Sequence, residues 1–396
     1  ICNEALVVFF FFLKTWNMTR NKIPAEVRFG GADELLGYIK KSIVRCSKIG
    51  TDDIFFKIYG EYRIGLKKYA QMLMQHLPET VSQSSSTYNL REKTFTENDL
   101  VTTCIIVNTG DYISDVLPGL ESRLRSSLSS EYEKKIDLSE LKERVFDETA
   151  LKSLEVLSSN IGNKIGVMLS HDLPECRKWN EVQKTDDQSS FIAKFKEILN
   201  KDIVLVHLLT VVHYHSYFDS QITKQIIPRY AMAIFKCRRI NEEGAHQLQI
   251  DTQLLKAALL DLPKLGIEES EALKEYSDVP CLYKANGNTP EVKISPSYKS
   301  YVNKEMGKIE GMLKTIAARY EKLEMLAVTF QSVVDKGSHQ DLRRIAELRG
   351  LRQKEVDTVV NAYNKMVPVQ DQGKPLIATE ATQPDLLKKM IGKLTG

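Results

Sequence analysis

The sequence has few cysteines, and they stand far apart. Six occur in 396 residues: Cys2, Cys46, Cys104, Cys176, Cys237 and Cys281. This spacing excludes the CxxC pairs of zinc sites and of redox motifs. Scattered thiols in a chain of this length are typical of a reducing compartment, where they act as small buried hydrophobes.

The sequence also lacks an excess of charge of either sign. Its 55 basic and 52 acidic side chains leave a formal net charge of +3. Such a balance gives no global argument for a nucleic-acid partner or a membrane partner. Any electrostatic function must therefore come from a local group of charges.

Long hydrophobic runs are missing. The longest, Leu6–Leu13, is much shorter than the roughly 20 residues that a membrane-spanning helix needs. No basic region precedes it and no clear cleavage site follows it, as a signal peptide requires. Because the chain begins with Ile1, we expect residues 1–31 to be an extraneous or disordered leader. A buried segment and a targeting segment are the alternatives.

Catalytic motifs are absent as well. The sequence contains no GxSxG, P-loop or GxGxxG pattern. His207, His213 and His215 lie close in sequence, but helical residues that share one metal ion usually stand three or four apart. His215 and Asp219 do share a helix face, and such a pair needs no metal. We therefore predict neither enzymatic activity nor a cofactor or metal site.

What the sequence does have is helical periodicity almost throughout. Because alternating strand patterns are missing, we predict an all-α fold of consecutive helical bundles, stacked end to end into an elongated rod. The expected helices are 32–49, 52–76, 97–128, 131–170, 188–218, 220–236, 241–262, 298–317, 319–336, 338–349 and 353–366. Pro118 should kink the third of these or divide it in two.

Composition shifts suggest the organisation of the chain. After residues 1–31, we expect helical bundles over 32–130, 131–266 and 267–367, and a mobile tail over 368–396. Polar runs at 79–93 and 277–296 predict loops, and the loss of apolar residues from 367 to 383 predicts disorder.

The most informative segment is 244–266. Its apolar side chains recur at steps of three and four and form one helical stripe, which consists of Ala245, Leu248, Thr252, Leu255, Leu259 and Leu262. Asn241 can cap the first turn, and Pro263 and Gly266 end the helix. Periodicity alone predicts a buried bundle helix.

The residues of this segment also resemble a known family. The pairs Gly244-Ala245, Gln247-Leu248, Asp251-Thr252 and Leu255-Lys256, followed by Leu259–Pro263 and Gly266, are similar to the C-terminal half of vacuolar protein sorting subunit fifty-three. Further similar blocks are Ala32–Pro78, Asp111–Leu124, Phe235–Cys237 and Lys308–Pro368, the last with Met312–Lys314 and Gly350-Leu351. Residues 1–31 do not match.

The resemblance implies a structural role without catalysis. The family belongs to the Golgi-associated retrograde protein (GARP) vesicle-tethering complex and its endosomal sister complex (EARP), which act in endosome-to-trans-Golgi retrograde transport and endosomal recycling. Its N-terminal coiled-coil half joins the sister subunits. The resemblance thus implies a cytoplasmic chain, peripheral on trans-Golgi network and endosome membranes, with sister subunits, and further SNAREs and small GTPases, as candidate partners.

The strongest local charge is a basic segment near the C-terminus, formed by Arg343, Arg344, Arg349, Arg352 and Lys354. It lies on an expected helix–turn–helix over 338–366, with Gly350 at the turn. A solvated face, a surface for a partner or an anionic membrane, and a nucleic-acid-binding module are the three interpretations. We take the segment as the candidate partner surface. Stability should not depend on it, because exposed charges contribute little. The near-neutral whole chain argues against nucleic acid.

The extreme C-terminus predicts a short conditional helix. Its apolar side would consist of Leu386, Leu387, Met390 and Ile391, opposite several lysines. About twelve residues are too few for a stable isolated helix in water. We expect it to form on a groove or on an anionic membrane, with docking onto its own bundle as the alternative.

Overall fold

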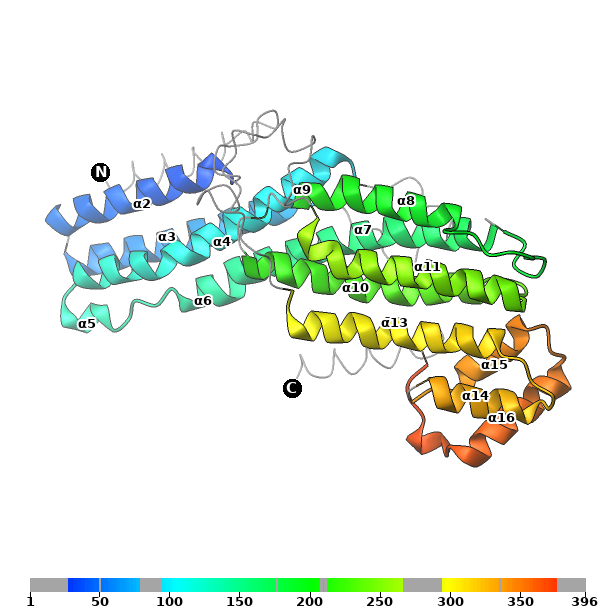
Figure 1. Cartoon of the computed structure of the whole chain (residues 1–396). Coiled ribbons are helices and arrows are strands. Elements are labelled where there is room, and N and C mark those ends of the chain that lie inside the picture. Colours follow the sequence, from blue (N-terminus) through cyan, green and yellow to red (C-terminus); the bar gives the residue numbers. More distant parts are fainter. Residues whose placement is uncertain are drawn as a thin grey trace. The chain divides into compact units, whose positions relative to one another are not determined.

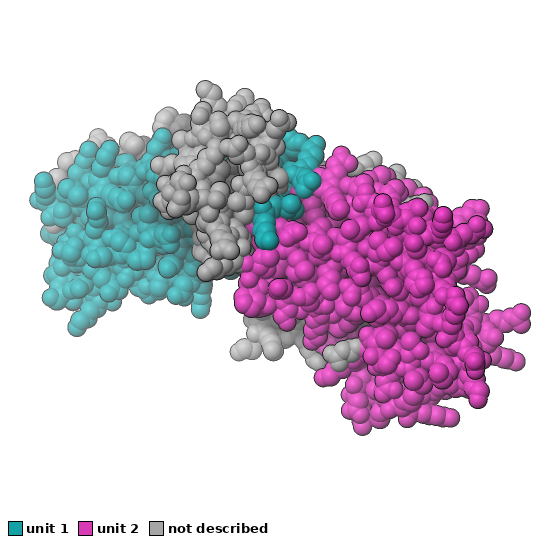
Figure 2. Space-filling model, in the orientation of Figure 1, with its two compact units in different colours: residues 1–161, 200–218, 264–292 teal, residues 162–199, 219–263, 293–396 magenta. Residues whose placement is uncertain are grey.

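The computed structural model describes residues 28–49, 51–78, 95–175, 177–206, 209, 212–265, 294–334 and 336–375. These residues form helices and no strands (Figure 1), so the predicted all-α class is confirmed. The chain divides into two compact units (Figure 2): unit 1 holds 1–161, 200–218 and 264–292, and unit 2 holds 162–199, 219–263 and 293–396. The predicted rod and the predicted segment boundaries stay predictions.

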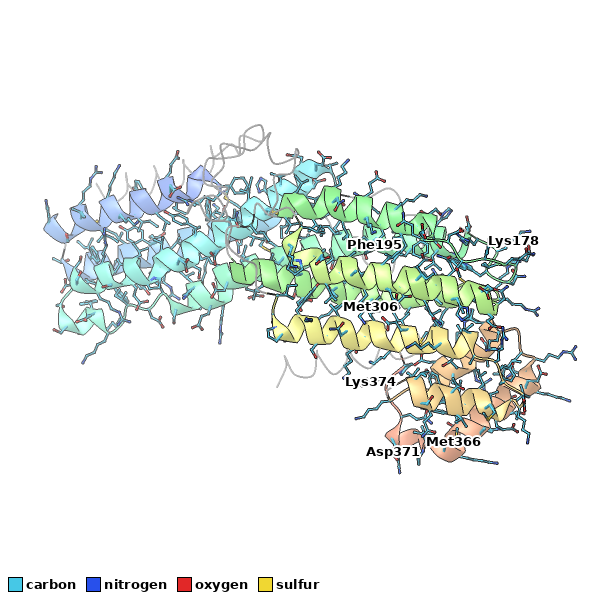
Figure 3. All side chains as sticks on the ribbon, viewed as in Figure 1. Lys178, Phe195, Met306, Met366, Asp371 and Lys374 are labelled. Carbon is cyan, nitrogen blue, oxygen red and sulfur yellow. The ribbon has the colours of Figure 1, made fainter. Side chains whose placement is uncertain are left out.

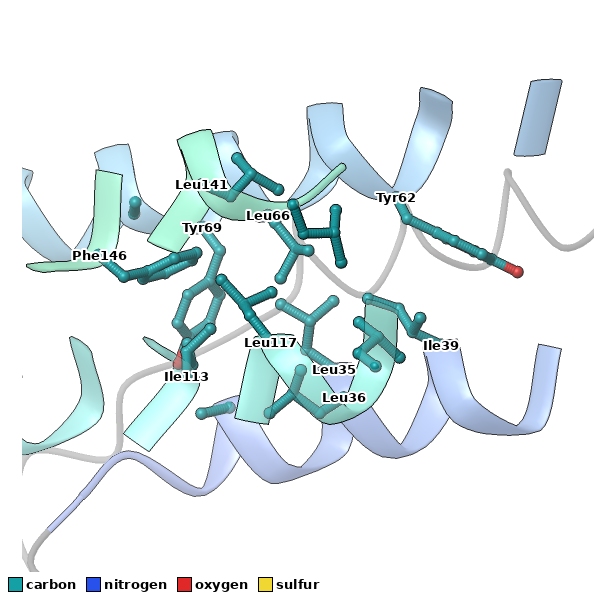
Figure 4. Close-up of a cluster of buried hydrophobic side chains, with 14 of the residues drawn as sticks. Leu35, Leu36, Ile39, Tyr62, Leu66, Tyr69, Ile113, Leu117, Leu141 and Phe146 are labelled. Atoms are coloured by element: carbon teal, nitrogen blue, oxygen red, sulfur yellow. The ribbon is translucent and has the colours of Figure 1, made fainter. Parts of the chain in front are cut away.

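Unit 1 is built around three long helices. They are α2 (Gly30–Ile49), α3 (Asp52–Gln75) and α4 (Glu97–Ser126). The unit also contains the short helices α5 (Ser130–Glu133), α6 (Ser139–Leu141) and α9 (Val204–Val206). Leu35, Leu66, Tyr69, Leu117 and Phe146 are fully or almost fully buried in one shared cluster (Figure 4). Burial of each large apolar side chain contributes about 1.5–3 kcal/mol, which is why the apolar stripes of these helices face one another.

Pro118 does not divide the third predicted helix. Helix α4 continues through it from Glu97 to Ser126. Thr96 and Asp99 form a reciprocal capping box at its start, so the first free backbone N–H groups are satisfied. Two separate helices, one of the two predicted outcomes, are therefore not found.

The predicted helix over 131–170 is displaced. The chain interrupts the helix at residues 134–138, passes through a π-helical turn at Lys142–Phe146, and only then forms α7 (Asp147–Glu175). Tertiary contacts hold the interruption: Glu121 accepts from the backbone N–H of Leu138 at 2.8 Å, and Arg125 donates to the carbonyl of Ile136 at 2.8 Å. These partners lie in α4, so local periodicity could not reveal them.

Unit 2 contains most of the C-terminal half. Its helices are α8 (Ser190–Ile198), α10 (Val212–Phe235) from residue 219 on, α11 (Glu242–Asp261), α13 (Pro296–Ala317), α14 (Glu324–Val333), α15 (His339–Leu348) and α16 (Gln353–Met366). The helix predicted over 188–218 passes through a π-helical turn at Leu199–Ile203 into α9, and residue 209 lies outside any helix. The predicted break between the helices 188–218 and 220–236 is wrong, because α10 is continuous from Val212 to Phe235. Helix α14 is also shorter than the predicted 319–336.

Helix α11 is the central element of unit 2. All six residues of its predicted apolar stripe are fully buried: Ala245, Leu248, Thr252, Leu255, Leu259 and Leu262. Asn241 caps the helix, since its side chain accepts from the Gly244 N–H at 2.7 Å. Helix α13 lies alongside (Figure 1), and Tyr298 donates to the Leu259 carbonyl at 2.6 Å. Both the stripe and the cap are thus confirmed.

Polar residues of α11 fix the loop that precedes α8. The buried carboxylate of Asp251 accepts from the backbone N–H of Ser189 at 2.8 Å and from its hydroxyl at 2.6 Å. Gln247 accepts from the Asp186 N–H at 2.5 Å. Burial raises the pKa of Asp251, and the Ser189 hydrogen bonds oppose this shift. The amphipathic pattern alone would not assign these buried polar residues a loop as partner.

The segment after α16 differs from the expectation of disorder. Residues 367–375 are placed against the last bundle, with a 3₁₀ turn at Val369–Asp371; Asp371 and Lys374 are labelled in Figure 3. Gln372 accepts from the His339 N–H at 2.9 Å and donates to Asn364 and to the Val367 carbonyl, both at 2.9 Å. One side chain thereby satisfies the start of α15 and the end of α16. The rest of the predicted tail, from residue 376 on, lies outside the described residues.

Candidate partner-recognition surface

The basic segment lies on a helical hairpin, as predicted. Helix α15 ends at Leu348, the chain turns at Arg349–Arg352, and α16 begins at Gln353. Gly350 makes the turn possible, because its φ of 84° is in the left-handed region that favours glycine. The inward apolar residues of both helices are buried: Leu342, Ile345, Leu348, Val356 and Val359.

Arg349 serves the fold. Its Nη1 donates to the carbonyl oxygens of Thr315 (3.1 Å) and Ala318 (2.6 Å) and to that of Ile316. These carbonyls end α13 and have no helical partner of their own. The guanidinium also lies 4.5 Å from the centre of the Tyr320 ring, and burial lowers the pKa of Arg349. Because of these contacts, we expect stability to depend on Arg349, unlike the general expectation for the basic segment.

Arg344 and Arg343 are engaged as well. Arg344 donates through Nε to the Phe235 carbonyl, at 3.0 Å, where α10 ends, and forms an ion pair with Glu347 at 2.8 Å. Arg343 pairs with Asp357 at 3.0 Å, which links α15 to α16. Both pairs are partly exposed and worth little each, but the bond to the Phe235 carbonyl satisfies a helix end.

Only Arg352 and Lys354 of the basic segment remain exposed without an ion pair among the described residues. The structure adds three cations that sequence reasoning missed as part of this surface: Lys236, Arg238 and Arg239, which are exposed in the loop between α10 and α11. We call Lys236, Arg238, Arg239, Arg352 and Lys354 the five-cation surface.

One backbone hydrogen bond and one side-chain contact bring the two parts of the five-cation surface together. The Ile240 N–H donates to the Leu348 carbonyl at 2.8 Å. The Arg239 side chain lies against the turn, since a Cβ at Gly350 would stand 3.0 Å from its Nε. The run Lys236–Arg239 was a visible basic signal in the sequence, but more than 100 residues separate it from Arg352. Only tertiary structure joins them.

The nucleic-acid interpretation is weakened by the charges of α16. In a helix-turn-helix reader, the first residues of the second helix approach the base edges between phosphates. Here Glu355 and Asp357 occupy the first turns of α16. Carboxylates at this position would face the phosphates that flank a DNA groove, which disfavours insertion of α16 into such a groove.

The described residues offer little for other kinds of site. No group of three or more His, Cys, Asp or Glu side chains within them could hold a metal ion. Across the same ranges, none of the helices combines the length and the apolarity that crossing a bilayer demands. The side chains of His207, His213 and His215, and the tail residues Leu386, Leu387, Met390 and Ile391, lie outside the described residues.

Comparison with known proteins defines the class of this fold. The C-terminal domain of the exocyst subunit Sec6p superposes with a TM-score of 0.54, covering 92% of this chain and 87% of that domain, at 10% sequence identity. At this identity the likeness concerns the fold alone. The chain thus shares the helical fold of that domain.

Sequence comparison then gives a family resemblance. Residues 246–351 match the family described as Vacuolar protein sorting-associated protein 53 C-terminus. Vacuolar protein sorting-associated protein 53 A of Arabidopsis thaliana is 26% identical over 338 residues, and the homolog of Caenorhabditis elegans is 23% identical over 358 residues. The chain is thus similar to vacuolar protein sorting-associated protein 53 over most of its length. The two matches cover 85% and 87% of this chain. The chain spans only 37% of the length of the Arabidopsis thaliana relative and 41% of the length of the Caenorhabditis elegans relative.

Proposed function

We propose that this chain forms the C-terminal part of a vesicle-tethering subunit of the GARP complex and of its endosomal sister complex. In this role it acts in endosome-to-trans-Golgi retrograde transport and in endosomal recycling. The observation that carries the proposal is the family match, which extends over most of the chain in relatives from a plant and a nematode. The likeness to an exocyst domain supports the same kind of role.

The proposed contribution of the chain is recognition, without catalysis. Its side chains at the candidate surface are helix-capping arginines, ion pairs and exposed cations, and none of these groups forms a nucleophile–base pair. Sister subunits are the expected partners. SNAREs, small GTPases and anionic membrane are further candidates, and the site of action is the cytoplasmic face of trans-Golgi network and endosome membranes.

A depletion and rescue experiment tests this function. Cells that lack the full-length protein should fail to return a cycling receptor from endosomes to the trans-Golgi network, and the full-length protein should restore its return. A truncated protein that lacks the region corresponding to this chain should not restore it. Normal retrieval in depleted cells, or full rescue by the truncated protein, would contradict the proposal.

A further inference from the structure

The five-cation surface carries positive charge that the fold does not use. Lys236, Arg238, Arg239, Arg352 and Lys354 are all exposed, and none forms an ion pair with the described residues. This contrasts with Arg343, Arg344 and Arg349, which hold a carboxylate or backbone carbonyls. The sequence groups all eight as basic, and the structure separates them.

The acidic groups around this surface are mostly engaged. Glu242 pairs with Arg319 at 2.9 Å, Glu347 with Arg344 at 2.8 Å, and Asp357 with Arg343 at 3.0 Å. Glu355 accepts from the Arg352 backbone N–H at 2.7 Å, at the start of α16, where the helix dipole favours an anion. Glu243 stands 3.9 Å from His246. The surface therefore keeps an excess of positive charge.

The kind of partner follows from what the surface lacks. No large apolar side chain is exposed in residues 236–240 or 349–354. The nearest along the chain is Met232, one helical turn before Lys236 and 41% exposed, and a single methionine is a small anchor for a peptide or a protein core. The five cations are long side chains with no fixed partner among the described residues. Such side chains suit a diffuse negative field, and clusters of four to eight Lys and Arg are typical of contact with anionic lipid headgroups.

We propose that the five-cation surface docks on anionic phospholipid headgroups by electrostatic adsorption without insertion. The surface joins the loop between α10 and α11 to the turn between α15 and α16. The proposal deepens the proposed function, since it supplies the means by which this part of a tethering subunit would meet a carrier or target membrane. Vesicle binding is measured on the chain itself, so its failure would leave the retrieval experiment untouched.

Vesicle co-sedimentation of the whole chain tests this proposal. The vesicles are phosphatidylcholine alone, or phosphatidylcholine with about 30% phosphatidylserine as a model of an anionic leaflet. The test variant R238E/R352E/K354E spares the three arginines that serve the fold. The matched control K304E/K365E/K374E makes the same change of net charge at exposed, unpaired lysines elsewhere in unit 2. The tail beyond residue 375 is present in every protein and contributes equally.

The unmodified chain should bind the anionic vesicles, and binding should weaken steeply as salt rises to about 0.5 M. The test variant should lose about tenfold or more in binding, since three basic residues that attract the anionic surface are replaced by acidic residues that it repels. The control should stay within about threefold of the unmodified chain. Circular dichroism checks folding, and R238A/R352A/K354A replaces the reversal variant if that protein does not fold.

Three results would overturn the proposal. One is equal binding by the test variant and the control. Another is no preference of the unmodified chain for phosphatidylserine. The last is binding to a polyglutamate peptide together with no binding to either vesicle, which would assign the surface to an acidic protein segment instead.

Discussion

At the scale of single residues, the basic segment separates into structural and free cations. Arg349 donates to carbonyls that end α13, and Arg344 donates to the carbonyl that ends α10. Arg352 and Lys354 have no such role. Sequence reasoning could not make this separation, because the acceptors lie about 30 and 110 residues away along the chain. The number of arginines was predictable, but their individual roles were not.

Replacement of Arg349 should therefore destabilise the protein. We expect Arg349→Met to lower the free energy of unfolding by about 2–3 kcal/mol, because a charged donor to several buried carbonyls is lost. Arg352→Met is the control, and its effect should stay within about 0.5 kcal/mol, as is usual for exposed sites. Urea denaturation measures both. Equal effects of the two replacements would refute the structural role of Arg349.

The buried carboxyl of Asp251 should make stability depend on pH. Burial raises its pKa above the ordinary 3.8 in the folded state, so the folded protein binds more protons than the unfolded chain. The stability linked to this group is fully present below pH 3.8 and is lost as pH rises through the raised pKa. The difference in unfolding free energy between the native chain and Asp251→Asn should therefore decrease as pH rises through the raised pKa. Urea titrations at a series of pH values measure this difference. A rise or a flat difference would contradict the assignment.

At the scale of elements, the sequence predicted those helices in which the buried residues are the apolar residues that repeat with the helical period. Helix α11 begins and ends within one residue of its predicted bounds, and its stripe is buried because the pattern repeats every three to four residues. The interruption at 134–138 and the π-helical turns were not predictable. They depend on partners such as Glu121 and Arg125 on another helix.

The stripe of α11 gives a direct test at this scale. Leu255→Ala and Leu259→Ala should each lower the free energy of unfolding by about 2–5 kcal/mol, because each change leaves a cavity in a closely packed core. Gln253→Ala, on the exposed side of the same helix, should change it by less than about 0.5 kcal/mol. Denaturant titration of the three variants decides. Small effects for both leucine variants would show that α11 is not the core of unit 2.

At the scale of the whole molecule, the fold class and the family resemblance were accessible from the sequence, and the five-cation surface was not. The all-α class follows from uniform helical periodicity, and the family from blocks of residues spread along the chain. The five-cation surface required the fold, because Lys236–Arg239 and Arg352 come together only through the contacts at Ile240 and Gly350. A charge pattern read along a sequence cannot show which distant cations share a surface.

The central proposal is that this chain works as part of a multisubunit vesicle-tethering complex. Affinity purification of the full-length protein from cells, with nuclease treatment and quantitative mass spectrometry, tests it most directly. We predict that the sister tethering subunits co-purify in amounts comparable to the tagged protein and that nuclease does not change their recovery. Recovery of nucleic acid and its binding proteins instead, with no tethering subunit above the level of an untagged control, would contradict the account.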